Sequence, residues 1–139
     1  MVKYLLASHG RFAEGTASFL KIMVGATDNI YTLSAFLDDR SVDAAVAQAL
    51  QQVGTFDQLL VFCDIHGGSV AQEVFRQTHD DTRDIQVIAG YNLALVMELM
   101  MKGRPVTPDE IRAAVQASRS AIVYLNDVSK PKAEEDALF

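Results

Sequence analysis

Short apolar runs alternate with segments of helical periodicity along most of this chain. The runs are rich in aliphatic, β-branched and aromatic residues, and they predict strands at 2–7, 29–36, 56–63 and 85–89. Apolar residues between and after them recur at intervals of three and four, which predicts helices at 12–24, 42–52, 70–78, 93–101 and 107–118. Such alternation favours parallel βαβ units, so we expect an α/β fold, with a doubly wound, mostly parallel sheet covered by helices on both faces.

The order of the strands decides where a ligand would bind. We expect the order 2-1-3-4, which places the first and third strands side by side where the direction of winding reverses. A fifth short strand is predicted at 121–125, after the last helix. We expect one domain at 1–126 and a flexible polar tail at 127–139, where periodicity is lost.

Polar residues mark the expected helix starts. Short polar side chains cap the free N–H groups of a first turn, which predicts N-caps at Ser41, Ser69, Asn92 and Thr107. Thr107 is the clearest of them, because Pro108 follows at the first helical position and two acids complete the first turn.

Composition excludes several classes of function. The chain has 139 residues, half of them apolar, and a net charge of −6, which argues against a nucleic-acid surface built from clustered Lys and Arg. Cys63 is the single cysteine, so we expect no disulfide within the chain, no cysteine metal site and no cofactor. No apolar run reaches the roughly 18 residues of a membrane span, and the N-terminus lacks a signal-peptide pattern. We therefore expect a soluble cytoplasmic protein that does not insert into a membrane.

The sequence Asp64-Ile65-His66-Gly67-Gly68-Ser69 links the third predicted strand to the third predicted helix. Glycines let the backbone approach a ligand closely. A helix N-terminus adds unpaired N–H groups and the positive end of the helix dipole. An acid, two glycines and a hydroxyl at such a turn outline an anion site.

A second polar turn, Ser8-His9-Gly10, follows the first predicted strand. In the order 2-1-3-4, His9 and Asp64 face each other across the switch point, although 55 positions separate them. Taken singly, a histidine after a strand is usually a loop or capping residue, and a turn with two glycines is usually structural. Their joint position is what favours chemistry.

A carboxylate bonded to one ring nitrogen of a histidine fixes the tautomer and leaves the other nitrogen free to attack. Histidine with its ordinary pKa of about 6.5 is mostly neutral, and therefore nucleophilic, in the cytoplasm. A phosphoryl group arriving on His9 would need donors, and we expect these from Gly10, Gly67, Gly68 and Ser69. Arg11 and His66 are expected at the rim of this site rather than in its chemistry.

Three stretches of the chain together carry a family resemblance. They are Tyr4-Leu-Leu-Ala-Ser-His9-Gly10 with Ala13-Glu14-Gly15, Asp64-x-x-Gly67-Gly68-Ser69, and Val87-Ile-Ala-Gly-Tyr-Asn-Leu93 with Leu95 and Glu98. Taken in order and at this spacing, they resemble the mannose-family IIA proteins of the bacterial sugar phosphotransferase system, and the resemblance covers about residues 2–126.

The resemblance implies a function that periodicity alone does not give. Family members accept a phosphoryl group from the phosphocarrier HPr on Nε2 of the histidine that matches His9, and the aspartate that matches Asp64 orients the ring. They pass the group to a IIB component, and a sugar crossing through the membrane components IIC and IID receives it. Members are homodimers that exchange an antiparallel last strand, which is near 121–125 in this chain. Since no IIB sequence follows, we expect either a free-standing IIA subunit or one cut from a larger chain.

The chain departs from the family beside the second motif. His66 stands where relatives commonly have an aromatic or large apolar residue, and Val70-Ala71 stands where many have Pro-Phe. We expect these changes to alter the docking surface rather than the pair of His9 and Asp64.

Two other functions stay open at this point. The second hypothesis is a non-transport regulator: either a sensor module or a phosphocarrier such as the phosphotransferase subunit of dihydroxyacetone kinase, a relative of the family that passes its phosphoryl group to a kinase subunit. A flavodoxin-like module that binds a nucleotide or metabolite without chemistry is the third hypothesis, although the chain lacks both a G-x-G-x-x-G motif and a P-loop.

Overall fold

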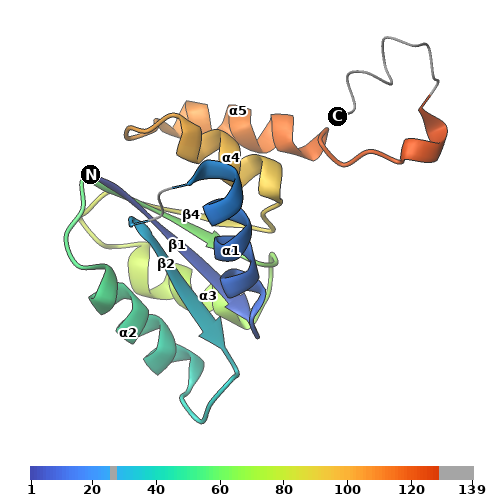
Figure 1. The fold of residues 1–139 in the computed structure, drawn as a ribbon. Coiled ribbons are helices and arrows are strands. Elements are labelled where there is room, and N and C mark those ends of the chain that lie inside the picture. Colours follow the sequence, from blue (N-terminus) through green and yellow to red (C-terminus); the bar gives the residue numbers. More distant parts are fainter. Residues whose placement is uncertain (26–27, 129–139) are drawn as a thin grey trace.

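The centre of the molecule is one sheet of four strands, β1 (Val2–His9), β2 (Ile30–Ala35), β3 (Gln58–Cys63) and β4 (Ile85–Ala89) (Figure 1). A computed structural model describes residues 1–25 and 28–128 of the chain. The strand order is β2-β1-β3-β4 and all three neighbouring pairs are parallel, which confirms the expected order and the α/β class. In the register, Ala35 lies opposite His9, and Cys63 lies opposite Ala7.

Helices cover both faces of the sheet, as a doubly wound fold requires (Figure 1). One face carries α1 (Phe12–Val24), α4 (Leu93–Met101) and α5 (Pro108–Arg119). The other face carries α2 (Val42–Val53) and α3 (Ser69–Thr78). All six residues of β3 are buried between the two layers, because central parallel strands are covered on both sides.

The predicted helix caps are confirmed in two cases. The Asn92 side chain accepts a hydrogen bond from the Leu95 N–H, and Thr107 forms a reciprocal capping box with Glu110 behind Pro108. Ser41 occupies an N-cap position, but its side chain makes no cap bond. The prediction for Ser69 is wrong: extended Gly68 is the N-cap of α3, and Ser69 is its first residue.

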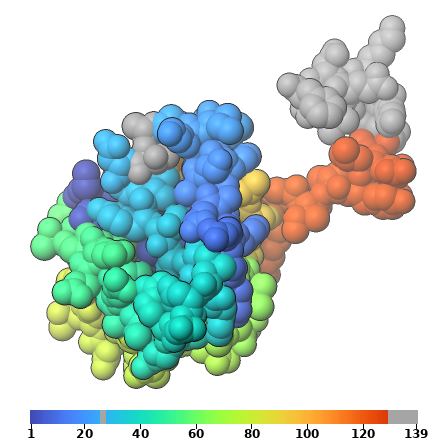
Figure 2. Space-filling view, turned by 60° about the horizontal axis from the view of Figure 1, so that its bottom comes forward, coloured from blue at the N-terminus to red at the C-terminus, as the bar shows by residue number. Residues whose placement is uncertain are grey.

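The predicted strand at 121–125 is wrong for the single chain. After α5 the chain leaves the body of the molecule and ends its described part in a 3₁₀ helix, η1 (Leu125–Asp127) (Figures 1 and 2). A strand needs a neighbour for its backbone groups, and this segment projects away from the sheet. Of the predicted tail at 127–139, residues 129–139 lie outside the described part of the chain.

Within residues 1–25 and 28–128, the helices are all too short or too polar to cross a membrane.

Candidate functional site

The site lies where the winding of the sheet reverses, between β1 and β3. The chain leaves β1 toward α1 on one face and leaves β3 toward α3 on the other face, so their carboxyl ends open a crevice. His9 is the last residue of β1, and Asp64 comes directly after β3. The fold therefore brings together the two residues that the sequence placed at this switch point.

His9 and Asp64 are in direct contact through one carboxylate oxygen. Nδ1 of the His9 ring lies 2.8 Å from Oδ2 of Asp64, and the backbone N–H of His9 donates to the same oxygen at 2.9 Å. The carboxylate only accepts, so Nδ1 carries the proton and Nε2 of the neutral ring has a free lone pair. The His9 side chain is 38% exposed and that of Asp64 only 11%, which leaves the ring accessible above a covered carboxylate.

The charge of Asp64 is secured by its hydrogen bonds. Burial raises the pKa of this carboxyl, but the backbone N–H and ring of His9 and the backbone N–H of Ile65 lower it by more. The net pKa lies below the ordinary value of 3.8, so Asp64 is ionised at neutral pH. An ionised carboxylate at Nδ1 stabilises any positive charge that develops on the ring.

The glycine turn surrounds the free edge of the His9 ring. The hydroxyl of Ser69 lies 3.4 Å from Nε2, a long contact in which the hydroxyl is the donor. A Cβ on Gly68 would come within 3.2 Å of Cε1 of His9 and 2.9 Å of Cγ1 of Ile65, so only glycine fits without displacing one of them. Within the described chain, the backbone N–H of Gly67 has no hydrogen-bond partner, and that of Gly68 makes at most a weak turn bond to the Ile65 carbonyl.

Gly10 and Arg11 are occupied elsewhere. The Gly10 N–H donates to the carbonyl of Ala35 at 2.9 Å, so it is not free for a phosphoryl group, contrary to our expectation from the sequence. The Arg11 guanidinium is 73% exposed and pairs with Glu14 one helical turn away. Of the anion donors predicted from the sequence, those of the turn at Gly67, Gly68 and Ser69 remain beside the His9 ring.

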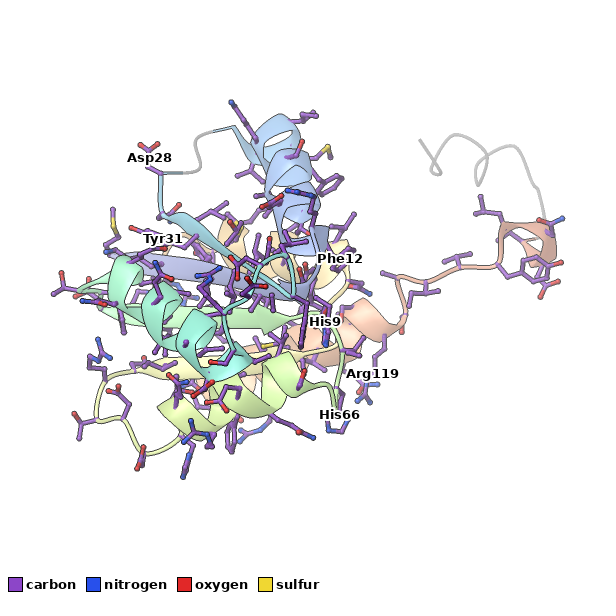
Figure 3. All side chains as sticks on the ribbon, turned by 90° about the horizontal axis from the view of Figure 1, so that it is seen from below. His9, Phe12, Asp28, Tyr31, His66 and Arg119 are labelled. Atoms are coloured by element: carbon purple, nitrogen blue, oxygen red, sulfur yellow. The ribbon has the colours of Figure 1, made fainter. Side chains whose placement is uncertain are left out.

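His66 lies at the rim. Its side chain is exposed, and it borders a hollow that Arg119 also lines. Figure 3 shows His9, His66 and Arg119 at the same end of the molecule, where the strands reach their carboxyl ends. In the described residues, no three His, Cys, Asp or Glu side chains gather into a metal-binding group.

Phe36 is a site residue that the sequence did not reveal. Its ring stacks on the His9 imidazole, with 5.2 Å between ring centroids and 11° between ring planes. In the sequence it looks like the last apolar residue of a strand, and no feature of residue type or spacing indicates this position. Its contact depends on the backbone turn after β2, which only coordinates reveal.

The arrangement suits nucleophilic attack by an imidazole on an electrophile that becomes anionic around it. One nitrogen is held by a carboxylate, the other faces outward, and a helix N-terminus with unpaired N–H groups lies beside it. Phosphoryl transfer needs this combination of positioning and charge stabilisation.

Comparison with known proteins gives a match to one protein family. Residues 3–116 match the family model of the mannose-type EIIA proteins, which is described as the PTS system fructose IIA component. This match covers both turns of the site and, except for Val2, all four strands.

Solved structures agree with the family match. A mannose/sorbose-specific IIA subunit of the phosphotransferase system from Enterococcus faecalis is 30% identical, with a TM-score of 0.68 over 94% of this chain and 96% of that one. A proposed sugar phosphotransferase permease from Klebsiella pneumoniae subsp. pneumoniae is 26% identical, with a TM-score of 0.80 over 91% and 92%. A phosphotransferase component EIIA from Streptococcus agalactiae shares the fold at 24% identity, with a TM-score of 0.77 over 92% and 100%.

Proposed function

Because the chain belongs to the mannose-type family of IIA components of the bacterial sugar phosphotransferase system, and so has a role in sugar phosphotransfer, we propose that His9 carries the phosphoryl group on Nε2. One observation supports this assignment above the others: Asp64 holds Nδ1 at 2.8 Å, while the opposite nitrogen faces solvent beside the glycine turn. The protein then acts as a phosphotransferase with a phosphohistidine intermediate.

Transfer to His9 is a direct displacement at phosphorus. The lone pair of Nε2 forms the N–P bond as the bond between phosphorus and the donor breaks, and the ring keeps its Nδ1 proton on Asp64. The ring gains positive character in this step, and the Asp64 carboxylate offsets it. The N–H groups of Gly67 and Gly68 and the Ser69 hydroxyl supply donors to the phosphoryl oxygens.

The partners follow from the family. We propose phosphorylated HPr as the donor and a IIB component as the acceptor, with the membrane components IIC and IID further along the route to the sugar. This exchange takes place in the cytoplasm. The exposed His9 ring supports it, because both partners must bring a reacting group to Nε2 in turn.

We also propose that two copies of the chain form a homodimer through the segment after α5. Four consecutive apolar residues, Ile122 to Leu125, are each at least 50% exposed in the single chain. Beside them lies an apolar hollow of about 660 Å³ whose walls include Phe12, Phe19 and Tyr91. In the dimer, the 121–125 segment of each copy packs on its partner and becomes the antiparallel strand that the single chain lacks.

Phosphorylation by HPr tests the main proposal. Wild-type protein incubated with phosphoenolpyruvate, the general enzyme of the system and HPr should take up label that is labile in acid and stable in alkali. His9→Ala should abolish the label, while His66→Ala and His79→Ala should keep it. Absence of label on the wild type, or label that survives His9→Ala, would contradict the proposal.

The protein that accepts the phosphoryl group from His9 distinguishes a role in sugar uptake from a regulatory role. Labelled protein mixed with a mannose-type IIB component should lose its label to that component. Transfer to a dihydroxyacetone kinase subunit instead would assign the chain to the regulatory branch of the family.

A further inference from the structure

Phe36 has a backbone conformation that side chains seldom adopt. Its φ is +67°, and within the described chain the other residues with positive φ are all glycines. This left-handed region costs free energy for a bulky residue and is found where the surrounding structure enforces it, often at functional sites.

The position of the loop explains how the strain arises. Ala35 ends β2 opposite His9, and its carbonyl accepts the Gly10 N–H at 2.9 Å, which ties the end of β2 to the turn after β1. The next residue then has to turn sharply, and the left-handed conformation puts the Phe36 ring over the imidazole.

Burial does not account for this arrangement. Phe36 is 59% exposed, so the strain is not balanced by placing the side chain in the core. Its ring instead lies parallel to the His9 ring within stacking distance.

From this geometry we propose that Phe36 is a positioning residue that fixes the plane of the His9 ring and so the direction of the Nε2 lone pair. The hydrogen bond to Asp64 holds one atom of the imidazole but leaves the ring free to tilt about that bond. The stacked ring removes this tilt, because it covers one face, while Gly68 borders the Cε1 edge. In-line attack at phosphorus depends on that direction. The proposal rests on His9 being the phosphoryl carrier.

The same chain contains a second stack of phenylalanine on histidine that serves as an internal comparison. Phe75 and His79 stack on the surface of α3 with centroids 5.4 Å apart, and Phe75 is 58% exposed. These two residues lie one helical turn apart, where stacking follows from ordinary helix geometry. Phe36 differs in its strained backbone and in the ring that it contacts.

Four variants distinguish the effect of the Phe36 ring on phosphoryl transfer from the effect of the backbone conformation of its loop. Phe36→Leu keeps the side-chain bulk but removes the stack, and Phe36→Tyr keeps the stack. Phe36→Gly removes both the ring and the strain. Phe75→Leu is the matched control for loss of an equally exposed phenylalanine. The rate of phosphorylation by HPr is measured for each over a range of HPr concentrations.

We expect Phe36→Leu and Phe36→Gly to lower the rate constant at saturating HPr by about 10-fold, with KM within about twofold of wild type. Phe36→Tyr and Phe75→Leu should match the wild type. Phe36→Gly should also unfold at a urea concentration no lower than wild type, because glycine accepts a positive φ without strain. This stability control shows that slower transfer does not come from loss of fold.

A second readout does not depend on transfer. In ¹⁵N-histidine-labelled protein, the Nδ1–H signal of His9 should be visible in the wild type and in Phe36→Tyr, and broadened in Phe36→Leu. A rise in KM alone would make Phe36 part of the docking surface and would overturn the positioning role. Unchanged rates and ring signals in Phe36→Leu would overturn it as well. If the wild type takes up no label, the carrier proposal fails, and the ring signals still decide whether Phe36 orients His9.

Discussion

A single oxygen atom organises the site. Oδ2 of Asp64 accepts both the backbone N–H of His9 and its ring Nδ1–H, at 2.9 and 2.8 Å. The first bond fixes where β1 ends relative to β3, and the second fixes the tautomer of the ring. Strand position and ring chemistry are thus controlled by one carboxylate.

Replacing the Asp64 carboxylate with an amide removes the charge of the side chain and keeps its shape. Asp64→Asn keeps the size of the side chain and an acceptor oxygen, so we expect the fold to persist. An amide cannot stabilise a positive ring equally, and we expect phosphoryl transfer from HPr to slow on the order of 100-fold. Stopped-flow or quenched-flow measurement of labelling, with Asp81→Asn as a control for loss of a carboxylate outside the site, checks this. Equal rates in Asp64→Asn and wild type would remove Asp64 from the mechanism.

At the residue scale, the sequence predicts which side chains meet better than it predicts backbone conformation and backbone hydrogen bonds. His9 and Asp64 could be predicted to meet because both lie at the carboxyl ends of strands, and the expected strand order places these two strands side by side. Phe36 could not be predicted, since its role depends on a positive φ that favours glycine in most chains. The Gly10 N–H was expected to be free, but the Ala35 carbonyl occupies it, and pairing across strands is not visible in a local motif.

At the scale of elements, a buried glutamine connects the start of β3 to the linker between α4 and α5. Gln58 begins β3 and is fully buried, and its side-chain amide both donates to and accepts from the backbone of Val106 at 2.8 Å. It also donates to Asp84 before β4. The linker between α4 and α5 is thereby fixed to the central strand.

Breaking this contact should destabilise the fold rather than the chemistry. Gln58→Leu leaves the N–H and C=O of Val106 without partners in the interior, which we expect to cost about 2 kcal/mol. Urea-induced unfolding measures the loss. Gln86→Leu, whose glutamine makes an exposed bond to Asp84, should change stability by less than about 0.5 kcal/mol. An equal decrease in the free energy of unfolding in the two variants would show that the contact with Val106 does not stabilise the fold more than an exposed hydrogen bond does.

Most element boundaries could be predicted because the spacing of apolar residues and the capping residues indicate the same starts and ends. β4 begins and ends at the predicted residues, and Asn92 and Thr107 begin their helices as expected. The assignment failed at 121–125, where apolar, β-branched residues predict a strand but the single chain offers no strand beside them. Propensity describes a segment, whereas a strand also needs a partner.

At the scale of the whole molecule, the segment after α5 is the part of the chain that we expect to form the dimer contact. Figure 2 shows it extending away from the body, as a connection that is narrow where it leaves the body. Exposed apolar residues in a row are unusual on a monomer and typical of an interface. We therefore expect dimerisation to cover this segment.

A charge placed on this segment should break the dimer. Ile122→Asp puts a carboxylate on a residue that lines the apolar hollow, and we expect the protein to shift from dimer to monomer at micromolar concentration. Light scattering coupled to size-exclusion chromatography reports the mass. Met101→Asp replaces a similarly exposed apolar residue that does not line the hollow and should remain dimeric. A monomeric wild type would contradict the assembly.

The central claim concerns one nitrogen atom, and nitrogen–phosphorus coupling observes it directly. In protein labelled with ¹⁵N-histidine and phosphorylated by HPr, the NMR spectrum should show phosphorus coupled to Nε2 of His9, with Nδ1 still protonated on Asp64. Coupling to Nδ1 of His9, or to a ring nitrogen of His66 or His79, would contradict the account.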